Sequence, residues 1–308
     1  MRLGLLAKSL TIFTCALAAA MAACGTPDRA NSNSVSGNSN GAAAREDGEP
    51  AGMPAAARPA GTPGFFMAGP TGAVSLHFLY PKDDTLVEGT SIAPEFTMTG
   101  YPIYFDSERK KGQHLHIILD DEPYEADYEP LRAFSPPDGK FDNLKEGTHT
   151  LRAFPGREWH ESIKQPDGAF DLVVFDVKRK TPGINVDQKA PLLTYSRPKG
   201  EYRWEEDPRG ILLDFYVTNA TLSPNGYKVK YTLNGKKSVL LDRWEPVWWK
   251  YEELTPGDQK VLLELLDSNM KPVPFKVGGV DYNHSEHTFK VLAKGEQSSA
   301  AGNANHHH

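Results

Sequence analysis

The sequence predicts an all-β protein of antiparallel strands, arranged as two copies of one design. Short apolar alternations such as Val74–Tyr80 and Leu115–Leu119 recur from residue 74 onward, separated by Gly, Pro, Asp and Asn. No stretch of eleven or more residues carries a 3.6-residue period, so the helices that connect parallel strands are not expected. The segment Gly112–Asp121 also aligns with Gly226–Gly235, which indicates an internal repeat.

The chain begins with a segment typical of export signals, residues 1–23. Arg2 and Lys8 give a positive start, and residues 10–23 are small or apolar without a charge. This apolar run is shorter than the roughly 20 residues that a permanent membrane-spanning helix needs. We therefore expect it to direct export.

The end of this signal, Met21-Ala22-Ala23-Cys24-Gly25, resembles the lipobox of bacterial lipoproteins. In that family the signal is cut before the cysteine, so the resemblance implies lipidation of Cys24 with acyl chains such as palmitate. Cleavage by an ordinary signal peptidase, releasing a soluble protein, is the alternative. Gly25 after the cysteine suggests an outer-membrane destination, by analogy with enterobacterial sorting. The expected location is thus the bacterial cell envelope, with a lipid anchor in the membrane.

Residues 24–70 are rich in Ala, Gly, Asn, Ser and Pro. This composition cannot bury enough apolar surface to offset the entropy of ordering, so we expect a disordered tether. Residues 295–308 form a similar polar tail that ends in His306–His308. The folded part is then two domains, 71–180 and 181–294. The first holds 13 Lys/Arg and 20 Asp/Glu and the second 16 and 15, and the absence of a basic excess argues against a nucleic-acid partner.

The repeat unit itself resembles a known fold. A strand, an Asx turn, a strand, an L-x-x-G segment and a further strand follow one another in each copy, with Leu144–Leu151 aligned to Leu254–Val261. This order is similar to that of bacterial immunoglobulin-like and fibronectin-III-like sandwiches, including tandem exported proteins of uncharacterised function. The resemblance implies two tandem immunoglobulin-like antiparallel β-sandwiches.

Three histidines form a candidate metal site. His114 and His116 are two apart on a strand and therefore share one face, while His160 follows the next core strand. Imidazole nitrogens suit Cu, Zn or Ni, provided that a third or fourth ligand is present. The alternative is that the pair lies on the solvent-exposed face of a sheet. By contrast, His149 shares a face with Leu151 and is expected to fill a structural corner.

Two further groups suggest binding. The acidic loop Asp120–Glu129 could hold Ca²⁺, although its spacing does not follow the EF-hand pattern. Trp159, Trp248 and Trp249 are candidates for binding a ligand, because loop aromatics often stack on sugars or proteins, while core packing is the alternative for this group.

No catalytic motif supports an enzyme. H-E-x-x-H, the P-loop and G-x-G-x-x-G are missing, and Ser196–Lys199 matches S-x-x-K by letter only, in a proline-broken stretch. We therefore expect a non-catalytic binding or surface-presentation module for an envelope protein or glycan. A transition-metal-binding protein is the alternative, and an enzyme of unknown reaction is the third.

Overall fold

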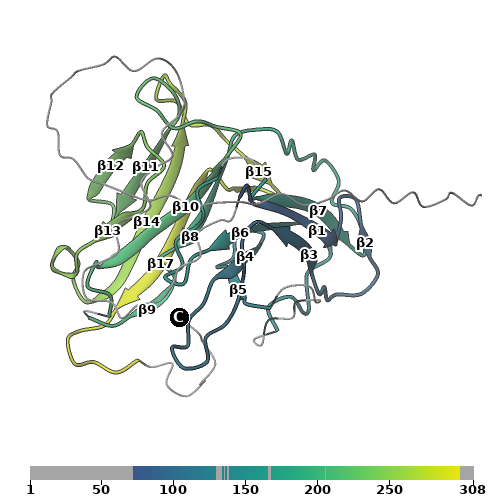
Figure 1. Ribbon diagram of the computed structural model, residues 1–308. Coiled ribbons are helices and arrows are strands. Elements are labelled where there is room, and N and C mark those ends of the chain that lie inside the picture. The colour runs from purple at the N-terminus through teal and green to yellow at the C-terminus, as the bar shows by residue number, and fades with distance from the viewer. Residues whose placement is uncertain are drawn as a thin grey trace, which may run out of the picture. The chain divides into compact units, whose positions relative to one another are not determined.

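The structure is a computed structural model that describes residues 72–129, 134, 136, 139–165, 168–204 and 206–298 (Figure 1). The predicted export signal, Cys24, the tether and His306–His308 lie outside these residues. The described part is almost entirely strand and connecting loop, with one 3₁₀ turn, η1, at Tyr251–Glu253. None of the helices found in this part is long and apolar enough to cross a bilayer.

The first copy consists of two sheets whose strands are mostly antiparallel. Its smaller sheet pairs β1 (Ser75–Tyr80) with β3 (Glu95–Thr99). Its larger sheet has the order β2-β7-β6-β4-β5, and the bounds are β2 Leu86–Val87, β7 Asp171–Val177, β6 Gly147–Gly156, β4 His114–Leu119 and β5 Glu125–Asp127.

The second copy repeats this plan. Its smaller sheet has the order β13-β10-β8, with bounds β13 Val247–Trp249, β10 Ile211–Thr218 and β8 Leu192–Arg197. Its larger sheet has the order β9-β17-β14-β11-β12, with bounds β9 Gly200–Tyr202, β17 His284–Val291, β14 Gly257–Leu266, β11 Lys228–Leu233 and β12 Lys237–Leu241. A short hairpin joins β15 (Lys276–Val277) to β16 (Val280–Asp281).

The aligned segments of the sequence occupy equivalent places in the two larger sheets. β4 pairs with β6 as β11 pairs with β14, and β6 pairs with β7 as β14 pairs with β17. Each sheet ends with a short strand parallel to its neighbour, β2 on β7 and β9 on β17. The fold is all-β, as the alternation pattern predicts, and it consists of two tandem sandwiches, as the resemblance of the repeat unit implies.

Each sandwich has a hydrophobic core of its own. Leu115, Ile117 and Leu119 of β4 pack into the first core, and Ile211, Leu213 and Phe215 of β10 pack into the second. These positions alternate along their strands because successive side chains of a strand point to opposite faces. The alternation therefore fixes which face of each sheet is internal.

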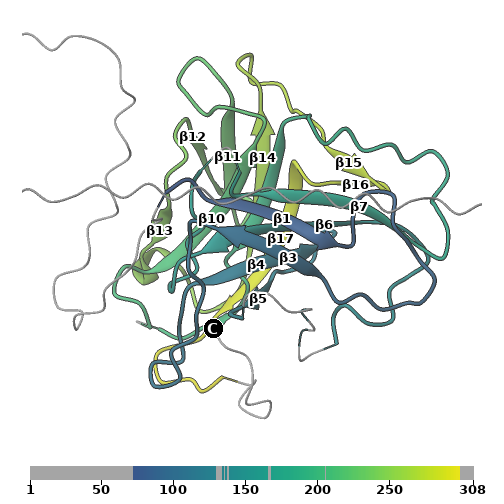
Figure 2. The same ribbon diagram turned by 45° about the vertical axis from the view of Figure 1, so that its right-hand side comes forward.

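The outer faces of two of these sheets are buried as well. Every residue of β4, β8 and β10 is buried, which a sheet with one solvated face would not show. Ile118 and Phe154 of the first copy cluster with Tyr216 of the second. The larger sheet of the first sandwich therefore packs its outer face on the smaller sheet of the second (Figures 1 and 2).

Buried polar contacts cross this junction. Arg152 on β6 donates from Nη1 to Thr194 Oγ1 of β8 at 3.1 Å. Lys164, in the loop after β6, pairs with Asp214 of β10 at 2.6 Å. Such groups are satisfied only in one mutual arrangement of the sheets, so they select the register in which the sandwiches meet.

Candidate metal centre and neighbouring pocket

His114 and His116 point from the same face of β4 into this junction. Both side chains are completely buried, with 0% exposure. The alternative of a solvent-exposed sheet face is therefore wrong for this pair. The parity of the strand places the two rings together, but β8 of the second sandwich covers them, through Ser196 against His116.

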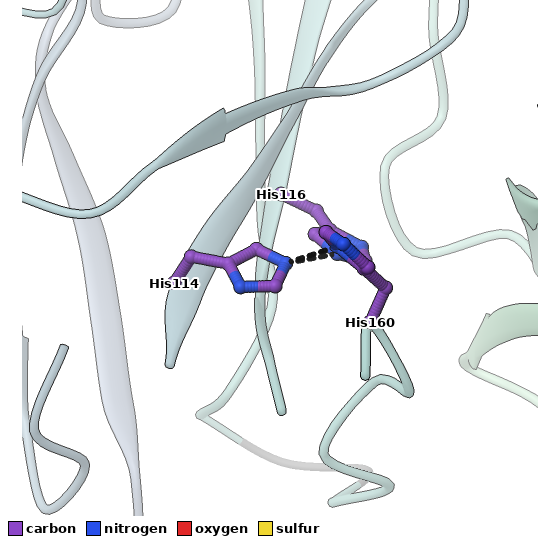
Figure 3. Close-up of side chains that lie close together, drawn as sticks. All are labelled: His114, His116 and His160. Carbon is purple, nitrogen blue, oxygen red and sulfur yellow. Dashed lines mark hydrogen bonds between the residues drawn. The ribbon is translucent and has the colours of Figure 1, made fainter. Parts of the chain in front are cut away.

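His160 reaches the same point from the loop that follows β6. A tight turn forms where the His160 N–H donates to the Arg157 carbonyl at 2.7 Å. His160 itself adopts a φ of 65°, the left-handed region that non-glycine residues rarely occupy. The turn directs its ring back toward β4, and Figure 3 shows the three imidazoles gathered together.

The three rings present their nitrogens to one another. His114 Nε2 lies 2.8 Å from His116 Nε2 and 2.9 Å from His160 Nδ1. The potential ligand atoms of all three residues lie within 4.8 Å of one another. Among the residues that the structure describes, this is the one group of three or more His, Cys, Asp or Glu side chains that converges in this way.

Hydrogen bonds at the far side of the rings set their protonation. His114 Nδ1 lies 2.8 Å from the Gly112 carbonyl, which only accepts, so this nitrogen donates and Nε2 carries the lone pair. Two other imidazole nitrogens thus approach a single lone pair, which accepts only one hydrogen bond well. A cation placed where the three nitrogens meet would accept an electron pair from each ring.

Burial determines the charge state of the strand pair. It lowers the pKa of His114 to about 3, with Arg197 and Lys199 acting in the same direction and the Gly112 hydrogen bond against it. Burial also holds the pKa of His116 well below its ordinary value. Both imidazoles are therefore neutral at neutral pH, which is the form that binds metal.

The surroundings leave little room beyond the rings. A Cβ added at Gly156 would lie 2.8 Å from His116 Nε2 and 3.1 Å from His114 Nε2. On its other side His116 stacks on Tyr124, with the ring centroids 3.8 Å apart. The glycine at the end of β6 and the aromatic platform together hold the nitrogens in place.

The donor set fits a transition metal. Zn–N bonds of about 2.0–2.1 Å in a tetrahedral site place ligand nitrogens roughly 3.3 Å apart, so His116 Nε2 and His160 Nδ1 would each need to move about half an ångström away from His114 Nε2. His116 Nδ1 lies 3.1 Å from Ser196 Oγ, and His114 Nδ1 donates to Gly112. Metal-binding histidines are usually oriented by such contacts on the other ring nitrogen.

The acidic loop uses its carboxylates in structural contacts. Asp120 accepts hydrogen bonds from His149 Nδ1 at 2.7 Å and from the Thr150 N–H at 2.9 Å. His149 Nε2 also donates to the Lys145 carbonyl at 2.8 Å, the corner contact that its parity predicts. Burial lowers the pKa of His149, but hydrogen bonding and charge from Asp120 outweigh it and leave that pKa raised.

The three tryptophans predicted to contact a ligand lie in different environments. Trp249 is 2% exposed and belongs to the second core, stacked on Phe289, so the prediction that it contacts a ligand is wrong. Its neighbour Trp248 points to the opposite face of β13, as alternation requires. Trp159 and Trp248 are partly exposed, and the Arg209 guanidinium lies 5.1 Å and 4.1 Å from their ring centroids.

Trp159 and Trp248 line a pocket beside the histidines, which we call the Arg197 pocket. Its wall includes His160, Arg197 and Tyr202. Both sandwiches contribute to it, since Trp159 and His160 belong to the first and Arg197 and Trp248 to the second. A ligand in this pocket would therefore lie next to one histidine of the triad.

Several residues of this region carry no functional signal in the sequence. Ser196 and Arg197 belong to a stretch that matches S-x-x-K by letter only. In the structure Ser196 Oγ contacts His116 Nδ1, and Arg197 lies in the pocket wall. Gly156 carries no signal beyond the end of a strand. Contacts between the two copies arise from packing of the sandwiches, which the local pattern does not encode.

Comparison with known proteins gives a limited result. No protein-family model and no curated protein matches the chain. Among solved structures, the chain is similar to the fibronectin(III)-like modules of Clostridium thermocellum CbhA, at 13% identity over 71% of this chain and 94% of that one, with a TM-score of 0.23.

Two other solved structures show likeness of the same order. One is SGBP-B from the Bacteroides ovatus mixed-linkage glucan utilization locus, in complex with a mixed-linkage heptasaccharide, at 12% identity over 70% of each chain and a TM-score of 0.19. The other is the D00-D0 domain of intimin, at 13% identity over 70% of this chain and 98% of that one, with a TM-score of 0.18.

Proposed function

We propose that this protein is a non-catalytic binding protein of the bacterial cell envelope that holds a transition-metal ion at His114, His116 and His160. The observation that carries the proposal is the convergence of three buried imidazoles, two from β4 and one from the loop after β6, whose potential ligand atoms lie within 4.8 Å of one another. Neutral imidazole selects Cu, Zn or Ni over the oxygen-preferring Ca and Mg. Because the site is deeply buried, we expect slow exchange of the ion.

Titration calorimetry tests this proposal. The background is the full chain with His306, His307 and His308 replaced by alanine, so that the tail cannot bind metal. Cu(II), Zn(II) or Ni(II) is expected to bind one-to-one, and at about 100 times the dissociation constant it stabilises the fold by about 2.7 kcal/mol. The absence of heat with all three ions, together with an unchanged melting curve, would refute the proposal.

Variants locate the site. His160→Gln, in the loop, is expected to weaken metal binding at least about tenfold while the strand pair stays packed. His77→Ala is the matched control, because His77 is exposed on β1 and is expected to leave the affinity unchanged. An equal loss of metal affinity in both variants would show that the loss does not depend on the three histidines.

The anchor is a separate part of the proposal, and it is supported by the lipobox resemblance of residues 21–25. Cells that express the chain are fed labelled palmitate, and the protein is expected to take up the label. Cys24→Ala is expected to abolish the labelling and to release the protein from the membrane fraction. Labelling that persists in this variant would place the acyl chain elsewhere.

A second function, recognition of a glycan or protein partner, is favoured by one observation. Trp159 and Trp248 meet at the Arg197 pocket, where both sandwiches contribute to the wall. A glycan array and pull-down from envelope extracts would identify the partner. Trp248→Ala is expected to remove the captured partner while metal binding is retained.

A further inference from the structure

The Arg197 pocket contains a buried cation. The side chain of Arg197 comes from the end of β8, and the residue is only 9% exposed. Its Nε donates to Tyr202 Oη at 3.1 Å and its Nη1 to the Trp159 carbonyl at 3.3 Å. Both acceptors are neutral, so the two contacts orient the guanidinium without neutralising it.

The buried Asp214 is the cross-strand partner of Arg197 and its charge favours the guanidinium, but its carboxylate pairs with Lys164. No carboxylate of the described residues forms an ion pair with Arg197. The pocket nevertheless contains acids, and three of them are engaged by other cations. These pairs are Glu158 with Arg109 at 2.9 Å, Glu201 with Lys290 at 3.6 Å and Asp207 with Arg209 at 2.6 Å. Glu206 is exposed and accepts from the Arg203 N–H.

A buried charge without a counter-ion is costly, and folded proteins normally pair such a charge. Nη2 of Arg197 makes no hydrogen bond to the described residues and therefore retains its donors. The guanidinium belongs to the pocket wall together with Trp159 and Trp248. Among the described residues no carboxylate pairs directly with this cation, and a bound anion would supply such a partner.

We propose that the Arg197 pocket binds a small organic carboxylate, whose negative charge pairs with the Arg197 guanidinium. A planar carboxylate matches the guanidinium fork. The four acids of the same wall repel any anion, and they repel a phosphate more strongly than a carboxylate because it carries more charge. The proposal deepens the recognition function suggested above, and it does not depend on the metal.

The test uses the full chain with the terminal histidines replaced, kept in EDTA so that no metal contributes. Two acids are titrated by calorimetry, D-galacturonate and N-acetylglycine, each beside its neutral counterpart, the methyl ester and the amide. At least one acid is expected to bind, and its counterpart at least about tenfold more weakly. These two arms distinguish a sugar acid from an amino-acid carboxylate.

Variants assign the binding to one residue. Arg197→Gln is expected to abolish acid binding, and Arg197→Lys is expected to weaken it because the fork is lost. Arg203→Gln is the control, since Arg203 is exposed and lies outside the pocket wall. Should Arg197→Gln fail to fold, the proposal is still tested by comparing each acid with its neutral counterpart on the unaltered pocket.

Three outcomes overturn the proposal. They are no binding of either acid, equal binding of an acid and its neutral counterpart, and preferential binding of inorganic phosphate. Failure here leaves the metal proposal untouched, because the metal titration is a separate measurement. Conversely, acid binding in EDTA stands even where no metal binds.

Discussion

The ion pair between Lys164 and Asp214 ties the two sandwiches together, and its removal gives a quantitative test of their junction. The Lys164 side chain is 6% exposed and that of Asp214 is fully buried, with Nζ and Oδ1 2.6 Å apart. Ser162, from the same loop as Lys164, also donates to Asp214 from its Oγ at 3.0 Å and from its N–H at 3.2 Å. Asp214→Asn keeps the shape of this group and removes its charge.

The expected loss in the free energy of unfolding follows from the geometry of this ion pair. At 2.6 Å and an effective dielectric constant of about 20, the Coulomb attraction is about 6 kcal/mol. Part of this is offset by desolvation, and breaking such a pair from one side typically costs about 3–5 kcal/mol. For a fold of this size that corresponds to a fall in Tm of roughly 6–20 °C.

Urea unfolding followed by tryptophan fluorescence measures the effect, because Trp244 lies 5.8 Å from the Lys164 ammonium. A double-mutant cycle with Lys164→Met isolates the pairwise energy, and the double variant is expected to lose less than the sum of the single variants. Glu286→Gln is the control, since its pair with Lys260 is 51% and 61% exposed and an exposed pair adds little to stability. An Asp214→Asn protein within about 0.5 kcal/mol of the parent would refute the reasoning.

Three other expectations follow from the same contacts. Ser196→Ala removes the group opposite His116 Nδ1 and is expected to weaken metal binding about 10–100-fold, measured by calorimetry, without a shift in the melting curve. Gly156→Ala places a methyl group 2.8 Å from His116 Nε2; it is expected to abolish metal binding and to cost about 1–3 kcal/mol in urea unfolding, and retained affinity would contradict the geometry. Burial, assisted by Arg152, lowers the pKa of His287 to about 4, so the neutral ring stabilises the fold fully above the unfolded pKa of about 6.5. This contribution is lost as pH falls toward 4, and His287→Gln should therefore flatten the fall in the free energy of unfolding over that interval.

Most of the fold could be predicted from the pattern of the strands. Leu115, Ile117 and Leu119 alternate with His114 and His116, and this parity alone says that the two histidines share a face opposite the core. The aligned segments Gly112–Asp121 and Gly226–Gly235 likewise occupy matching strands of the two larger sheets. These are properties of single strands and of the order of strands, so local sequence is sufficient for them.

Tryptophan shows where local sequence is insufficient. Trp248 and Trp249 are adjacent and chemically identical, yet one lines a pocket and the other fills a core. Strand alternation requires that they point to opposite faces, but a three-residue strand such as β13 does not reveal which face is internal. That choice depends on the partner sheet.

The sequence by itself therefore determined the all-β class and the repetition of one strand order, and it predicted the grouping of His114, His116 and His160. Tertiary structure alone decided that these rings are buried, that Ser196 touches one of them and that Arg197 lies in a pocket wall with none of the described carboxylates at ion-pair distance. The physical reason is that two outer sheet faces meet. Burial, pKa and ion pairing all depend on what covers a side chain, and here the cover comes from a segment about eighty residues away.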